Sequence, residues 1–127
     1  MCEPWADPVW NRETYLRHAK ASQRMWGMSL ARMNTVAKGS KSLYNPFVHW
    51  TEVRDFEMGC VPDANGVIEH GVFIAETGHV RTYYFDTEDE IGYSNGELTT
   101  YIFVMWHCTG EVHGYPITLS ELRRDKL

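Results

Sequence analysis

The sequence predicts a single α+β domain over residues 1–127, in which a long N-terminal helix packs on a four- to five-stranded antiparallel β-meander and a short C-terminal helix follows. Three observations lead to this fold class. The length suits one domain, and 43% hydrophobic with 13% aromatic residues suffices for a core. The clearest helical periodicity lies in the N-terminal third, and turn glycines separate β-rich stretches after residue 65. Curling of the meander into a half-barrel is the alternative arrangement.

The first third of the chain predicts an irregular arm over 1–10 and a helix over 11–38. Asn11 is a good N-cap, and Gly39 suits the residue just past the helix end. Gly27 weakens the helix interior by about 1 kcal/mol relative to alanine. The buried stripe is expected from apolar residues at close to helical spacing, namely Leu16, Ala19, Trp26, Leu30, Met33 and Ala37.

Residues 66–118 predict the antiparallel meander. A turn glycine precedes each of four β-rich stretches, which cover 67–76, 79–86, 97–108 and 111–118. Glycine supplies the positive φ that tight turns need, and Asn-Gly is the strongest short hairpin signal. Short turns between successive strands favour antiparallel neighbours.

Residues 45–58 fit either an edge strand or a helix. Asn45 followed by Pro46 resembles an N-cap and first helical residue, and Gly59 is a suitable stop. A helix or a mixed segment is therefore expected here.

A short terminal helix is expected over 119–126. Thr118 or Ser120 would cap it, and Glu121 lies in its first turn, where a carboxylate suits the helix dipole.

Both faces of the predicted strand 97–108 are apolar, so this strand is expected to be central and covered on both sides. A two-residue turn at 109–110 would place Trp106 opposite His113. In that register His107 points to the face opposite His113.

A two-residue turn at 77–78 places His70, Arg81 and Tyr83 on one face of a ribbon, and His113 is a candidate fourth member from another strand. Histidine can move the 2′-hydroxyl proton of RNA, and arginine can stabilise phosphate charge. These four residues are the predicted catalytic set of the alternative function, a small metal-independent ribonuclease or phosphodiesterase. The alternative is a purely structural role, in which His70 is a solvated or hydrogen-bonded strand residue and Arg81 pairs with a neighbouring acid.

No cofactor and no metal are predicted. Zinc would have to come from Cys60, His107, Cys108 and His113, whose spacing matches no Cys-x-x-Cys or His-Glu-x-x-His pattern. The expected register also separates His107 from the other two residues of its hairpin.

An acidic loop is the predicted partner-binding site. Asp86, Glu88, Asp89 and Glu90 place four carboxylates in five residues. The loop lacks the alternating ligands and central glycine of a calcium loop. These charges can simply keep an exposed loop solvated, or they can bind a basic partner.

Charge is divided unevenly along the chain, whose net charge is −5. Residues 11–41 hold seven bases and one acid, whereas residues 42–122 hold two bases and thirteen acids. The two parts can attract each other, which disfavours nucleic-acid binding through the basic face of helix 11–38 but leaves it open.

A cytoplasmic location without membrane contact is expected. Cys2, Cys60 and Cys108 are not spaced like a disulfide framework and favour free thiols in a reducing compartment. The longest apolar run, 101–106, is too short to cross a bilayer, and the N-terminus lacks the basic and apolar regions of a signal peptide.

These patterns predict a non-enzymatic accessory or inhibitory module, of the phage, mobile-element or immunity type, that presents an acidic surface to a basic protein partner. No Walker loop, GxGxxG or GxSxG motif is present, which favours a non-enzyme. A homodimer packed through its sheets is a third possibility, because the strand 97–108 needs cover on both faces.

Overall fold

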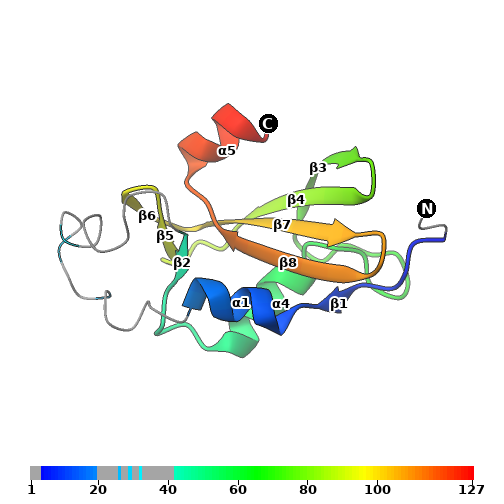
Figure 1. Ribbon diagram of the computed structural model, residues 1–127, viewed down its shortest axis with the longest axis horizontal. Helices are drawn as coiled ribbons and strands as arrows, with labels where there is room; N and C mark the ends of the chain where they lie inside the picture. Colours follow the sequence, from blue (N-terminus) through cyan, green and yellow to red (C-terminus); the bar gives the residue numbers. More distant parts are fainter. Residues whose placement is uncertain (1–3, 20–25, 27–28, 30–31, 33–41) are drawn as a thin grey trace.

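The computed structural model describes residues 4–19, 26, 29, 32 and 42–127, and it is an α+β arrangement of two sheets and flanking helices (Figure 1). The larger sheet has the strand order β1-β8-β7-β4-β3, and the smaller one has the order β2-β5-β6. The strands of the larger sheet are β1 (Val9–Trp10), β3 (Val72–Thr77), β4 (Val80–Asp86), β7 (Tyr101–His107) and β8 (Glu111–Pro116).

The predicted meander is present as β3, β4, β7 and β8, each antiparallel to the next. The N-terminal arm adds β1, which runs parallel to β8 with Val9 opposite Glu111. The larger sheet is therefore mixed, and the prediction of a purely antiparallel sheet is wrong at this edge. An arm of this kind pairs through backbone groups alone, so its side chains carried little strand signal.

The smaller sheet contains β2 (Leu43–Tyr44), β5 (Gly92–Ser94) and β6 (Glu97–Thr99). Asn95 and Gly96 form its hairpin turn, with positive φ values of 46° and 91° as the Asn-Gly signal predicts. The predicted strand 97–108 is broken at residue 100. The Thr99 hydroxyl accepts a hydrogen bond from the Tyr101 amide (3.1 Å) and donates one to the Ile117 carbonyl (2.7 Å), so side-chain bonds replace ladder bonds there.

Helix α1 (Arg12–Ala19) begins where the sequence predicts it, and the Asn11 side chain accepts a hydrogen bond from the Thr14 amide. The predicted unbroken helix over 11–38 is wrong. Trp26 lies in a turn and Ser29 in irregular backbone, and the Ser29 hydroxyl accepts a bond from the Arg32 amide, as a helix cap does. The remaining residues of 20–38 lie outside the described residues.

The ambiguous segment forms helix α4 (Trp50–Met58), which confirms the helical alternative. Its N-cap is His49 instead of Asn45, and Gly59 is its C-cap, as predicted. Helix α5 (Leu119–Asp125) follows Thr118, which forms a capping box with Glu121.

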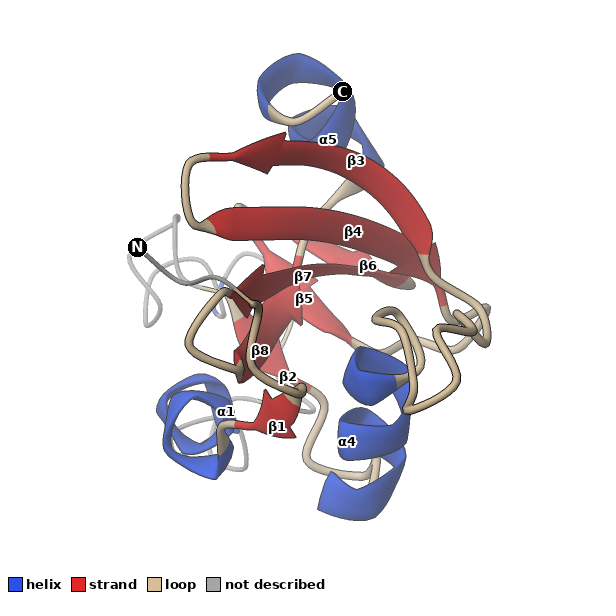
Figure 2. Ribbon diagram, turned by 90° about the vertical axis from the view of Figure 1, so that its right-hand side faces the viewer, coloured by secondary structure: helices blue, strands red, loops and turns tan. Residues whose placement is uncertain are grey.

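Strand β7 lies in the middle of the larger sheet and is covered on both faces, as predicted (Figure 2). One face packs against α4 and the loop after it, with a core that includes Val53, Cys60, Val61, Tyr83, Ile102, Val104, Trp106 and Val112. The other face packs against α5, with Phe103, Ile117 and Leu122 at its centre. Helix α1 lies along β8 and β2, and its Tyr15 packs against the core on the α4 side (Figure 1).

The predicted register of the β7–β8 hairpin is wrong by one residue. Met105, and not Trp106, lies opposite His113. The loop has three residues instead of two, since the Gly110 amide donates to the His107 carbonyl and Gly110 has a φ of +108°. A shift of one residue reverses the face of every side chain on one strand relative to the other. His107 and His113 therefore share a face.

The predicted turn of the β3–β4 hairpin is also displaced. Thr77 lies opposite Val80, so residues 78–79 form the turn, and the pairing shifts again between Phe73 and Ala75. Strand β3 begins at Val72, so His70 precedes it. Arg81 and Tyr83 still share a face, because alternation within one strand does not depend on the turn.

The cysteines differ from expectation. Cys60 is free and fully buried, whereas Cys108 is disulfide-bonded. The prediction of three free thiols is thus wrong for Cys108, and the cytoplasmic location stays a prediction that free thiols no longer support. Within the described residues, the helices are all too short or too polar to cross a membrane.

Candidate functional site

His70, the first residue of the predicted catalytic set, is held by packing between α4 and β4. Its ring stacks on Phe85 with centroids 4.0 Å apart, and its Nε2 lies 2.7 Å from the Phe56 carbonyl oxygen. A side chain at Gly59 would collide with this ring, since an added Cβ would lie 2.2 Å from it. The His70 ring therefore has a structural role in packing α4 against β4.

Arg81 and Tyr83 lie on β4, on the face that packs against α4. The Arg81 guanidinium donates to Glu76 at 2.6 Å and lies 4.0 Å from the centroid of Trp5. Tyr83 is only 2% exposed, and burial raises the pKa of its hydroxyl. Both residues therefore have partners inside the fold.

His113 lies on the other face of the same sheet. Cross-strand partners share a face, so Trp106 lies with Arg81 and Val112, whereas Met105 lies with Thr82 and His113. The structure therefore brings His70, Arg81 and Tyr83 to one face and separates His113 from them.

His107 and His113 form a close pair between β7 and β8. Their Nε2 atoms are 2.9 Å apart, and their ring centroids are 5.1 Å apart with planes inclined by only 13°. The centroids are thus farther apart than the nitrogens by about the width of one ring, so the nitrogens point at each other nearly in line. This is the geometry of one N–H···N bond, in which one ring donates and the other accepts.

The histidine pair lies in an environment that disfavours added positive charge. Burial is the main cause that lowers the pKa of His113, and nearby His107, His18 and Arg17 lower it further, whereas Glu111 raises it. The buried Nδ1 of His113 has no hydrogen-bond partner among the described residues. Protonation of both rings would place two cations in contact at a half-buried position.

The predicted acidic loop projects three carboxylates into solvent. Glu88, Asp89 and Glu90 are exposed, whereas Asp86 is half-buried and accepts a hydrogen bond from the Glu88 amide at 3.0 Å. The Thr87 hydroxyl donates to the Thr100 carbonyl at 2.8 Å and anchors the loop to the sheet. The loop is therefore shaped by internal bonds and presents a solvated charge run.

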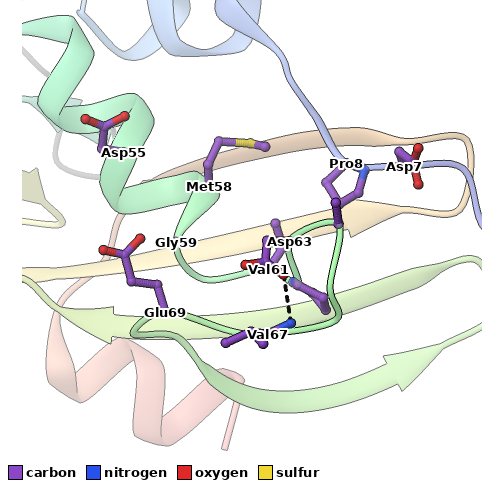
Figure 3. A pocket seen from close by; sticks show the side chains of 11 residues that line it. Asp7, Pro8, Asp55, Met58, Gly59, Val61, Asp63, Val67 and Glu69 are labelled. Atoms are coloured by element: carbon purple, nitrogen blue, oxygen red, sulfur yellow. Dashed lines mark hydrogen bonds between the residues drawn. The ribbon is translucent and has the colours of Figure 1, made fainter.

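A second acidic feature, which we call the acidic pocket, was not predicted. It is a pocket of about 550 Å³ between the N-terminal arm, the end of α4 and the loop that leads to β3 (Figure 3). Its apolar lining comes from Pro8, Met58, Val61, Pro62 and Val67. Every ionisable side chain that lines it in the described part of the chain is a carboxylate, namely Asp7, Asp55, Asp63 and Glu69.

Asp63 shapes one wall of the acidic pocket. Its Oδ1 accepts a hydrogen bond from the Val67 amide (3.0 Å; Figure 3) and another from the Asn65 amide (2.8 Å), while its own amide donates to the Val67 carbonyl. An Asx turn of this kind pins a loop without regular structure. The same turn positions Val67 in the lining of the acidic pocket.

Glu57 is the most unusual ionisable residue, and the sequence interpretation missed it. It is 1% exposed in the core between α4 and β8. Trp10 Nε1 donates to it at 2.9 Å, the Tyr44 hydroxyl donates to its other oxygen, and the Gly114 amide also donates. Burial raises its pKa to about 7, against the lowering effect of these three donors. It joins β1, β2, α4 and β8.

A signal for Glu57 was present in the sequence. Val53 and Glu57 are four residues apart on α4, and both are buried. A carboxylate at helical spacing from a core valine marks a buried acid once the segment is known to be a helix.

None of these groups forms a preassembled metal site. Among the residues that the structure describes, no three His, Cys, Asp or Glu side chains lie close enough to share an ion. Comparison with protein-family models, with curated proteins and with solved structures gave no match. The function is therefore argued from the site alone.

Proposed function

We propose that the chain is a non-enzymatic accessory or inhibitory module, of the phage, mobile-element or immunity type, that binds a basic protein partner through acidic surfaces. The observation that carries the proposal is the acidic pocket, whose lining combines apolar side chains with carboxylates and, among the described residues, no base. A lysine or arginine side chain has the matching character, an apolar stem that ends in a cation.

Two acidic surfaces are candidates for the contact. The first is the acidic pocket, and the second is the exposed loop that contains Glu88, Asp89 and Glu90. The pocket is favoured, because a concave apolar lining can desolvate a partner side chain, whereas charges on an open loop remain screened by salt.

The test measures binding of a fluorescent lysine-rich peptide by anisotropy at low and high salt. The pocket variant removes three charges through Asp55→Asn, Asp63→Asn and Glu69→Gln. The matched loop variant removes three through Glu88→Gln, Asp89→Asn and Glu90→Gln. The substitution Asp63→Asn retains a side-chain oxygen that can hold the turn, so the pocket variant keeps its fold.

The pocket variant is expected to lose most of the binding, while the loop variant keeps it. Loss in the loop variant alone would move the contact to the loop. Equal loss in both variants would mean that net charge alone attracts the peptide, and no binding by the wild type would contradict the proposal.

The alternative of a small ribonuclease or phosphodiesterase is less favoured by the geometry, because His113 lies on the opposite face of the sheet from Arg81 and Tyr83. Incubation of the protein with RNA and with cyclic dinucleotides tests it. Cleavage of either substrate by the wild type that is lost in both His70→Ala and His113→Ala would support this alternative.

The homodimer remains a prediction, and the structure weakens the argument for it. It was motivated by an apolar strand that needs cover on both faces, and α4 and α5 supply that cover within one chain. Light scattering across concentrations measures the oligomeric state directly.

A further inference from the structure

Exposed apolar side chains gather at the start of β3. Within seven residues, Val67 is 58% exposed, Ile68 36%, Val72 46% and Phe73 52%. The other large exposed apolar residues of the described chain are scattered over distant elements. Single exposed apolar residues are common, whereas a local group of them marks a contact surface.

Val72 and Phe73 lie on an open sheet edge, and Val67 and Ile68 lie in the loop that leads to it. Strand β3 is the last strand of the larger sheet, and no described residue pairs with its outer side (Figure 2). Unpaired backbone N–H and C=O groups on such an edge can accept a further strand. Val67, in the loop that leads to β3, also lines the acidic pocket, so the exposed apolar group extends from the pocket to the start of the edge.

The charges near β3 indicate which kind of segment can pair with its open edge. Asp63, Glu69 and Glu76 are exposed beside it, and among the described residues only Glu76 of these three has a basic partner, Arg81. A second copy of the chain is a poor occupant. A copy would bring the same carboxylates and the same net charge of −5 to this edge, and like charges that face one another are unfavourable.

We propose that β3 is a docking edge at which an extended, basic segment of the partner adds as a further strand of the larger sheet. Its apolar side chains cover Val72 on the α5 side of the sheet. Its lysine or arginine side chains lie on the α4 side, where their stems cover Phe73 and their charges reach Glu69 and the acidic pocket. The inference rests on the proposed function, because it specifies how the basic partner binds.

The test uses three synthetic peptides with the full wild-type chain, in isothermal titration calorimetry. The first alternates lysine and valine over seven residues, the second is the same peptide N-methylated at alternate residues, and the third contains lysine alone. N-methylation removes the backbone donors on one edge of a strand while it keeps charge and side chains. The expected result is that N-methylation weakens binding about ten-fold or more.

Two protein variants complete the test. Val72→Lys places a charge on the edge and is expected to weaken binding of the alternating peptide by a similar factor. The matched control Leu98→Lys changes an exposed residue of β6, in the other sheet, and should bind as the wild type does. The N-methylated peptide needs no variant, so it decides the question even if Val72→Lys unfolds.

Each failure has a distinct meaning. Equal binding of all three peptides, lost in the pocket variant, would overturn strand addition and leave the proposed function standing. No binding of any basic peptide would overturn both. A doubled mass in light scattering that Val72→Lys abolishes would assign the edge to a second copy of the chain and overturn the basic partner.

Discussion

Glu57 links four elements through three donors, and its ionisation opposes folding. The pKa of Glu57 is raised from 4.5 to about 7 in the folded protein, chiefly by burial. A carboxyl with a raised folded pKa contributes stability that is complete below pH 4.5 and is lost as pH rises through about 7. The difference of about 2.5 pKa units corresponds to about 3 kcal/mol.

The variant Glu57→Gln tests this linkage, because glutamine has a similar shape and does not titrate. The free energy of unfolding of the wild type, minus that of the variant, should fall by about 3 kcal/mol between pH 4.5 and pH 8. Urea denaturation followed by tryptophan fluorescence at each pH measures it. Parallel profiles for the two proteins would show that Glu57 titrates normally.

The contact between His107 and His113 predicts the direction in which the pKa of His113 changes when His107 is removed. His107 is one of the groups that lower the pKa of His113, and its ring also contributes to burial. His107→Ala should therefore raise the pKa of His113. NMR titration of the ring signals measures the change, with His79→Ala in the β3–β4 turn as the control. An unchanged or lowered pKa of His113 would mean that the contact at 2.9 Å does not form in solution.

At the scale of elements, the sequence predicted some helix ends and the hairpin positions better than the strand registers. Thr118 and Gly59 act at helix ends as expected, since a capping residue works within one turn of chain. Thr109-Gly110 is compatible with a two-residue or a three-residue loop, and the pairing of Trp106 with Val112 shows that the loop has three residues. That one additional residue placed His107 on the wrong face in the prediction.

Helix α5 depends on its cap to cover the sheet. Thr118 is 3% exposed, and its hydroxyl accepts a hydrogen bond from the Glu121 amide at 3.2 Å. Thr118→Ala is expected to cost about 1 kcal/mol, and Thr118→Ser should cost much less because it keeps the hydroxyl. Ser120→Ala, at an exposed position, is the control in urea denaturation. Equal losses in the alanine and serine variants at position 118 would assign the cost to the methyl group.

At the scale of the whole molecule, the features that the sequence did not reveal are contacts between distant segments. The parallel pairing of β1 with β8 and the acidic pocket both join the N-terminal arm to segments at least 45 residues away. Local periodicity carries no information about such pairings. The acidic loop, in contrast, was visible in the sequence because its charges are contiguous.

Buried Glu57 and half-buried His113 give the molecule opposing responses to acid, and they lie on opposite sides of β8. Glu57 contacts Gly114 on the α4 side, while the adjacent residue, His113, points to the other side. The pKa of His113 is lowered from 6.5, so its contribution to stability is present above pH 6.5 and is lost as pH falls through the folded value. Glu57 gains stability over the same fall in pH.

The wild type should therefore gain less stability between pH 7 and pH 5 than the variant His113→Gln does, because the titration of His113 opposes that of Glu57. Relative to the double variant Glu57→Gln/His113→Gln, the single variant Glu57→Gln should lose stability as pH falls, because only His113 still titrates. His113→Gln should gain stability over the same range. Urea midpoints of all four proteins measure these slopes, and slopes of the same sign in both single variants would contradict the assignment of opposing groups.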